Sequence, residues 1–175
     1  MIDCPSCGAE NIPGVDECSG CGQPLSDLHL QTPESELEQN LLTDRVSVLE
    51  PKEPITIEPG MQVRDVLRLM VDQKIGCLIV AEDGKPIGIF SERDALMKLN
   101  VDVIAFGDRP VSDFMTPSPQ TLEANAKLVF ALQRMDVGGY RHLPIVDDEG
   151  QLTGIVSVRD ILQYLTKAVT ATGTA

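Results

Sequence analysis

The sequence lacks any long apolar run, and acidic side chains outnumber basic ones by 27 to 14 in its 175 residues. A membrane-spanning helix needs about 20 consecutive apolar residues, so none is predicted. The first residues form neither a basic nor an apolar stretch, so we expect no secretory signal and a cytoplasmic protein. The formal net charge of −13 argues against broad nucleic-acid binding, because phosphate backbones would be repelled.

Residues and motifs typical of catalysis are also scarce. The chain has only two histidines, His29 and His142, and neither forms a recognisable pair with a cysteine or serine nucleophile. It contains no Walker loop and no dinucleotide-binding glycine motif. We therefore predict that the protein is not an enzyme. Hydrophobic residues make up 42% of the chain, which is enough for one or two small domains with a core.

Four of the five cysteines form two C-x-x-C pairs, Cys4 with Cys7 and Cys18 with Cys21. Two such pairs with a ten-residue spacer are typical of a closed, structural zinc site, and iron is an alternative metal. Disulfides or a redox-active dithiol are further alternatives, but without a secretory signal a metal is favoured. The glycines after each pair, Gly8 and Gly22, should let backbone amides point at the sulfur atoms. The fifth cysteine, Cys77, adjoins an apolar run and is predicted to be a core residue.

Residues 1–24 resemble a rubredoxin-like zinc ribbon. The segment holds four acidic residues and no lysine or arginine, so we expect it to contact protein or to serve structure alone. Residues 25–45 form an acidic linker with one predicted amphipathic helix, Pro33 to Thr43, which either docks on the main domain or acts as a spacer. Residues 169–175 are predicted to be a disordered tail.

The rest of the chain is an internal duplication. The phrase G-h-h-S-x-x-D, where h is hydrophobic, occurs at residues 88–94 and again 66 residues later at 154–160. Each copy follows an apolar run and a turn and precedes an amphipathic stretch, so the predicted order is β-α-β-β-α, twice. The predicted strands are Cys77–Ala81, Lys85–Phe90, Leu143–Val146 and Leu152–Val156; the predicted helices are Met61–Gln73, Ser91–Leu99, Ala126–Met135 and Val158–Thr166.

This duplicated phrase, with the R-H-L-P-I-V-D run at residues 141–147, resembles the CBS domain, named after cystathionine β-synthase. The resemblance implies an α/β (α+β) fold with two CBS units, residues 46–107 and 108–168, packed as a pseudo-twofold pair. It also implies two clefts that bind adenosine compounds such as AMP, ADP, ATP or S-adenosylmethionine. Members of the family commonly form dimers, so we expect a homodimer.

The serine and aspartate of each phrase, Ser91 with Asp94 and Ser157 with Asp160, have two interpretations. They can form a capping box at a helix start, or they can bind a ribose, since a carboxylate accepts bonds from both ribose hydroxyls. The resemblance implies the second role for both pairs. It also gives phosphate-facing roles to Arg141 and His142.

Two further arginines, Arg93 and Arg159, lie in the first turn of their predicted helices, where a phosphate partner would rationalise them. Ordinary surface arginines are the alternative. The first repeat lacks an Arg-His pair, so we expect unequal clefts. The sequence thus predicts a regulatory protein that senses an adenosine nucleotide and passes the change to a protein partner; the alternative is an interaction or dimerisation scaffold without nucleotide binding.

Overall fold

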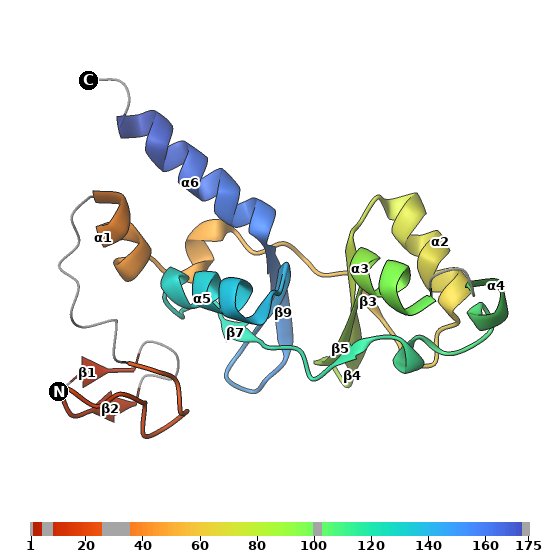
Figure 1. The fold of residues 1–175 in the computed structure, drawn as a ribbon, viewed down its shortest axis with the longest axis horizontal. Coiled ribbons are helices and arrows are strands. Elements are labelled where there is room, and N and C mark those ends of the chain that lie inside the picture. Colours follow the sequence, from red (N-terminus) through yellow and green to blue (C-terminus); the bar gives the residue numbers. More distant parts are fainter. Residues whose placement is uncertain (1, 5–8, 26–35, 100–102, 173–175) are drawn as a thin grey trace. The chain divides into compact units, whose positions relative to one another are not determined.

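The computed structural model describes residues 2–4, 9–25, 36–99 and 103–172 (Figure 1). The chain divides into two compact units, each built from separate stretches of sequence. Unit 1 comprises Met1–Pro51, Leu122–Arg141 and Val156–Ala175, and unit 2 comprises Lys52–Thr121 and His142–Ile155. The hairpin of the second repeat therefore belongs to the same unit as the sheet of the first.

Unit 2 contains a four-stranded sheet in the order β3-β4-β5-β6. The strands β3 and β4 are parallel, whereas β4–β5 and β5–β6 are antiparallel. The β4–β5 turn depends on Gly84, whose φ of 77° lies in the left-handed region that favours glycine. The bounds are β3 (Thr56–Ile57), β4 (Cys77–Glu82), β5 (Lys85–Ser91) and β6 (Thr116–Pro117).

The core of unit 2 forms where α2 (Val63–Gln73) covers this sheet. The apolar face of α2 presents Val63, Val66 and Met70 at helical spacing, and they cluster with Leu78 and Phe90 of the sheet. Helix α2 begins two residues later than predicted because the backbone of Gln62 is extended.

The helix predicted to run from Ser91 to Leu99 is α3 (Glu92–Asp94) followed by a π-helical turn, η2 (Ala95–Leu99). A 3-10 turn η4 (Val111–Asp113) and the short helix α4 (Val103–Phe106) precede β6. The widened turn was not predicted, because π-helical turns are rare and occur mostly as single turns within α-helices.

The segment leading into each repeat pairs with the last hairpin strand of the other repeat. In one direction Thr116 of β6 pairs with Ile89 of β5. In the other, the amide of Lys52 donates to the carbonyl of Ile155 at 3.0 Å, and the amide of Ile155 donates back at 2.9 Å. In the first copy, the glycine that opens the motif lies in close contact with the segment before the second repeat, because a Cβ on Gly88 would overlap the Met115 side chain.

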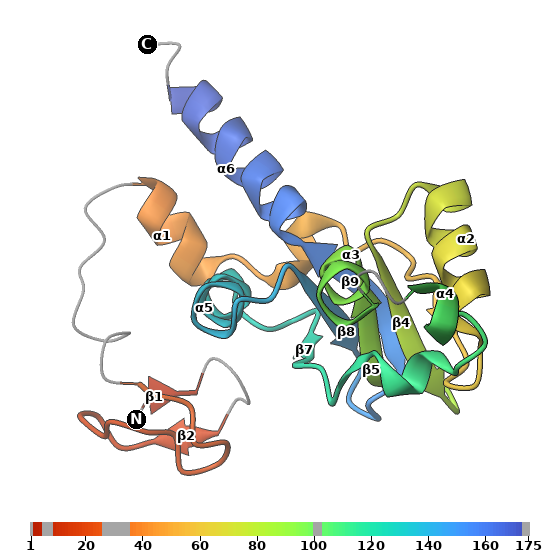
Figure 2. The same ribbon diagram turned by 45° about the vertical axis from the view of Figure 1, so that its right-hand side comes forward.

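The second hairpin consists of the neighbouring strands β8 (His142–Val146) and β9 (Leu152–Ser157), which lie beside the first hairpin (Figure 2). The amide of Leu152 donates to the carbonyl of Gly84 at 2.8 Å, which joins the turns of the two hairpins. All four hairpin strands contain the predicted ranges and extend beyond them by one residue at one end.

Unit 1 holds the other elements of the second repeat and the N-terminal segments. Helix α5 begins at Leu128 and not at Ala126, because Lys127 is still extended, and α6 continues six residues beyond the predicted end at Thr166. Helix α6 thus takes in residues 169–172 of the predicted tail; residues 173–175 lie outside the described part. The bounds are β1 (Ile2–Asp3), β2 (Glu10–Asn11), α1 (Glu36–Thr43), η1 (Val46–Leu49), β7 (Leu122–Glu123), α5 (Leu128–Gly138) and α6 (Val158–Thr172).

The linker forms the predicted helix in part. Helix α1 begins at Glu36, and the predicted start at Pro33 lies outside the described residues. Two backbone bonds fasten the segment after α1 to the second repeat: Val46 donates to Ala126 at 2.8 Å, and Leu128 donates to Asp44 at 2.8 Å. These bonds hold residues 44–46, which directly follow the predicted helix, against the second repeat. Within the described ranges, no helix is long and apolar enough to span a membrane.

Candidate functional site

Three of the four ribbon cysteines converge in unit 1. The sulfur atoms of Cys4, Cys18 and Cys21 all lie within 4.8 Å of one another, and those of Cys4 and Cys21 are 3.7 Å apart. Cys4 and Cys18 are buried, whereas Cys21 is exposed. Cys7, the fourth predicted ligand, lies outside the described residues. The antiparallel pair β1–β2 brings the first cysteine toward the second C-x-x-C segment.

The surroundings of Cys18 suit a thiolate. Burial alone would raise the pKa of Cys18. Hydrogen bonds from the amides of Gly20 and Cys21 and from side chains outweigh this effect, so the pKa is lowered to about 6. The Gly20 amide donates to the Cys18 sulfur at 3.3 Å, and the Asn11 side chain donates at 3.5 Å. A sulfur-rich donor set of this kind fits zinc or iron.

Sequence analysis missed Asn11. Buried Asn11 also accepts from the amide of Ser19 at 2.9 Å, so it connects β2 with the second cysteine pair. The tight turn predicted at Gly22 is present, since its φ of 69° is left-handed and its amide donates to the Cys18 carbonyl at 2.8 Å. The amides of Gly20 and Cys21 are the ones that donate to the Cys18 sulfur. Gly8 lies outside the described residues.

The first motif aspartate, Asp94, is buried at the start of α3, and both of its carboxylate oxygens have polar partners. One carboxylate oxygen accepts from the Ser91 amide at 3.0 Å and the Ser91 hydroxyl at 2.6 Å. The other accepts from the Thr116 hydroxyl at 2.9 Å and lies 2.8 Å from the ammonium of Lys98. The capping-box interpretation is therefore confirmed for this pair.

These hydrogen bonds and the ion pair favour the charged form of the Asp94 carboxyl group. Burial raises the pKa of Asp94, but the bonds from Lys98, Ser91 and Thr116 outweigh burial, and the net pKa is lowered. Beside it, burial raises the pKa of the Cys77 thiol to about 12, aided by the charge of Asp94. The prediction that Cys77 is a core residue is confirmed, since it is 8% exposed.

The second motif aspartate, Asp160, is also buried but has different neighbours. One of its carboxylate oxygens accepts from the Ser157 amide at 2.8 Å and the Ser157 hydroxyl at 2.5 Å, as in the first copy. At the repeat offset, however, Lys98 corresponds to Tyr164. The Tyr164 hydroxyl turns to the linker and donates to Asp44 at 2.6 Å. Burial and this bond raise the pKa of Tyr164 to about 12.

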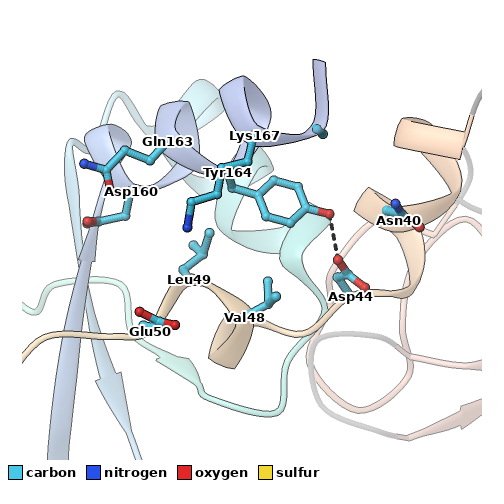
Figure 3. A pocket seen from close by; sticks show the side chains of 10 residues that line it. Asn40, Asp44, Val48, Leu49, Glu50, Asp160, Gln163, Tyr164 and Lys167 are labelled. Atoms are coloured by element: carbon cyan, nitrogen blue, oxygen red, sulfur yellow. Dashed lines mark hydrogen bonds between the residues drawn. The ribbon is translucent and has the colours of Figure 1, made fainter. Parts of the chain in front are cut away.

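Asp160 lines a cavity of about 490 Å³ that lies wholly within unit 1 (Figure 3). Helix α6 forms one side, with five lining residues at helical spacing, and α1 with the segment at η1 forms the other. Figure 3 shows Lys167 and Tyr164 projecting from α6, with Asp44 bonded to the Tyr164 hydroxyl. The lining residues are Asn40, Asp44, Val48, Leu49, Glu50, Asp160, Gln163, Tyr164, Lys167 and Ala168.

The predicted basic residues are not in this lining. The Arg141 carbonyl accepts from the Val158 amide at 3.0 Å, so the Arg141 backbone lies at the start of α6, near Ser157. The side chains of Arg141, Arg93 and Arg159 are exposed, and His142 is half-buried. The cation in the lining is Lys167, which sequence analysis missed because the helix was predicted to end at Thr166.

The fold and these sites define a tandem β-α-β-β-α pair with a buried carboxylate at each final helix start. The sequence matches the family described as CBS domain over residues 48–100 and 111–167, more than half of the chain. The chain therefore belongs to the CBS domain family and carries a tandem pair of these domains, as predicted. The mixed α/β fold class is likewise confirmed.

Two known proteins show the range of this similarity. An uncharacterised 17.7 kDa protein of Acidianus ambivalens is 29% identical over 126 residues, which cover 71% of this chain and 74% of that protein. The crystal structure of CBSX2 in complex with AMP is 26% identical with a TM-score of 0.61, and the match covers 71% of this chain and 97% of that chain.

Other curated relatives are much longer than the matched region. Inosine-5'-monophosphate dehydrogenase of Aquifex aeolicus is 33% identical over 118 residues, but the match spans 22% of that enzyme. The similarity is confined to the CBS region of that enzyme.

Proposed function

We propose that this protein is a non-enzymatic sensor that binds an adenosine compound in the Asp160 cavity. The single observation that carries the proposal is a cavity of about 490 Å³ with the buried motif carboxylate in its wall. Its volume lies within the range for small-molecule sites. The AMP bound by the related CBSX2 supports an adenosine compound as the ligand class.

In this proposal Asp160 and Ser157 bind the ribose hydroxyls. The Asp160 carboxylate is already fixed by Ser157, so it is preorganised to accept further bonds from a vicinal diol. Arg141, His142 and Arg159 would meet the phosphates of a nucleotide, if it carries any.

The equivalent residues of the first repeat, Ser91, Asp94 and Arg93, form the weaker site. Asp94 already accepts four bonds from protein groups, two of them from Lys98 and Thr116. A ribose there would have to displace these partners. We therefore expect unequal affinities at the two motifs.

The ribbon and linker pass the bound state to a protein partner. A ligand in the cavity would touch Asn40 and Asp44, and α1 connects this wall to the cysteine segment. We propose that Cys4, Cys7, Cys18 and Cys21 hold a structural Zn²⁺. Such an ion would supply folding energy to a segment too small to form its own core.

We further propose a cytoplasmic homodimer through the CBS pair, without membrane or nucleic-acid contact. Leu96 and Leu162 occupy equivalent positions of the two repeats and are 74% and 56% exposed. Met97, next to Leu96, is also 74% exposed. Exposed apolar residues at matching places suit a self-complementary interface. The competing proposal is a scaffold whose CBS pair only dimerises.

Calorimetric titration of the metal-loaded protein with S-adenosylmethionine, AMP and ATP tests the proposal. Saturable binding that is lost in Asp160→Ala and in the closer mimic Asp160→Asn, but kept in the surface control Asp148→Asn, would support it. Light scattering should show that the dimer persists in every variant. No binding at millimolar ligand, with an intact dimer, would favour the scaffold.

A further inference from the structure

The Asp160 cavity extends beyond the CBS match. Asn40 and Asp44 of its wall come from α1 and the residue after it, whereas the matched residues begin at 48. Asp44 is held in place by two bonds: its carboxylate accepts from the Tyr164 hydroxyl at 2.6 Å, and its carbonyl accepts from the Leu128 amide at 2.8 Å. The linker therefore supplies a fixed acidic side chain to a ligand site of the second repeat.

The cavity lining is acidic. Three carboxylates face one ammonium group, since Asp44, Glu50 and Asp160 line it together with Lys167. The formal charge of the lining is thus −2, from three acids and one base. Figure 3 shows these acids on different sides, with Asp44 beyond the Tyr164 hydroxyl and Glu50 below Asp160.

The remaining lining is neutral. Asn40 and Gln163 offer amide donors and acceptors, and Val48 and Leu49 offer an apolar surface for a flat ring. An uncharged nucleoside could use these groups without meeting repulsion. A positively charged substituent would be attracted by the carboxylates and by the face of Tyr164.

We propose that Asp44 and Glu50 are specificity-determining residues that make the cavity select an uncharged or cationic adenosine compound over a phosphorylated one. This inference rests on the proposed function, because it assigns the ligand class of the same cavity. It also means that Arg141 and Arg159, which lie outside the lining, would not be needed to bind the favoured ligand.

The effect should be measurable for each acid. A phosphate charge about 8 Å from a carboxylate, in a partly solvated site, is disfavoured by about fivefold in affinity. Removing one carboxylate charge should therefore raise the affinity for AMP relative to the affinity for adenosine by about fivefold.

Calorimetry on the full-length, metal-loaded protein tests this with four probes: adenosine, S-adenosylmethionine, AMP and ATP. The wild type should bind S-adenosylmethionine and adenosine more tightly than AMP, and AMP more tightly than ATP. Asp44→Asn keeps an oxygen that can accept from Tyr164, and Glu50→Gln keeps the side-chain length. Each should raise the AMP-to-adenosine affinity ratio about fivefold, while the exposed-turn control Asp148→Asn leaves it unchanged.

The failures of the inference and of the proposed function are distinguishable. Binding of AMP or ATP tighter than adenosine, abolished in Asp160→Asn, would overturn the selectivity and leave the sensor standing. An unchanged ratio in both charge variants would do the same. If none of the four probes binds, both proposals fall together.

Discussion

Replacing Asp94 by alanine should destabilise the protein markedly, although the residue lies at the weaker of the two proposed sites. Its carboxylate accepts from the amide and hydroxyl of Ser91 and from the hydroxyl of Thr116, and it pairs with Lys98. Asp94 is 8% exposed, so water cannot fully replace these bonds.

The magnitude follows from the separate contacts. Loss of the cap costs about 1 kcal/mol. Leaving part-buried donors without an acceptor adds about 1 to 2 kcal/mol. The ion pair contributes at most about 0.5 kcal/mol, because the Lys98 side chain is 37% exposed. We therefore expect Asp94→Ala to lower the free energy of unfolding by about 3 kcal/mol at pH 7.

The loss should depend on pH in one direction. The folded-state pKa of Asp94 is lowered from its ordinary 3.8, so the carboxylate contributes stability above about pH 4. That contribution disappears as the pH falls through the folded pKa. Urea denaturation of wild type, Asp94→Ala and the exposed-turn control Asp148→Ala, from pH 7 downward, measures this. A loss under about 1 kcal/mol at pH 7, or one that does not shrink in acid, would contradict the assignment.

Three other changes have expected outcomes. Tyr164→Phe should cost about 1 kcal/mol of unfolding free energy by removing the bond to Asp44. Because the folded pKa of Tyr164 is raised to about 12, the contribution of that bond should be complete below pH 10 and disappear as the pH rises through 12 in wild-type denaturation curves. Phe130→Ala, at a fully buried position, should cost about 3 to 5 kcal/mol by the same assay. A strong chelator should remove one metal ion, which mass spectrometry of the protein before and after treatment would detect. The NMR amide signals of residues 1–25 alone should then collapse, and unchanged signals would contradict the metal site.

The repeated turns show what the sequence could predict. Gly84 and Gly150 are separated by the repeat offset, and both adopt left-handed φ values of 77° and 79°. Local chemistry decides such turns, since only glycine occupies that region without steric cost. The hairpin strands followed from the same local patterns.

The division into units could not be predicted in that way. The two hairpins join through Leu152 and Gly84, and Lys52 pairs with Ile155, more than 100 residues further along. Such pairings depend on tertiary contacts that leave no periodic signal. Lys167 was missed for a related reason: the repeat predicted a helix that ends at Thr166, whereas α6 extends to Thr172.

The two motifs differ in a way that the repeated phrase conceals. Sequence analysis placed the difference at Arg141 and His142, beside the second motif. The structure adds another, one helical turn after each aspartate, where Lys98 stands in the first copy and Tyr164 in the second. A lysine at that position pairs with its own aspartate and occupies the site. A tyrosine of similar length reaches the linker instead, and the second aspartate lines a cavity whose other wall is that linker. The difference between lysine and tyrosine thus joins α6 to the linker in the second copy, beside the cavity that Asp160 and Asp44 line together.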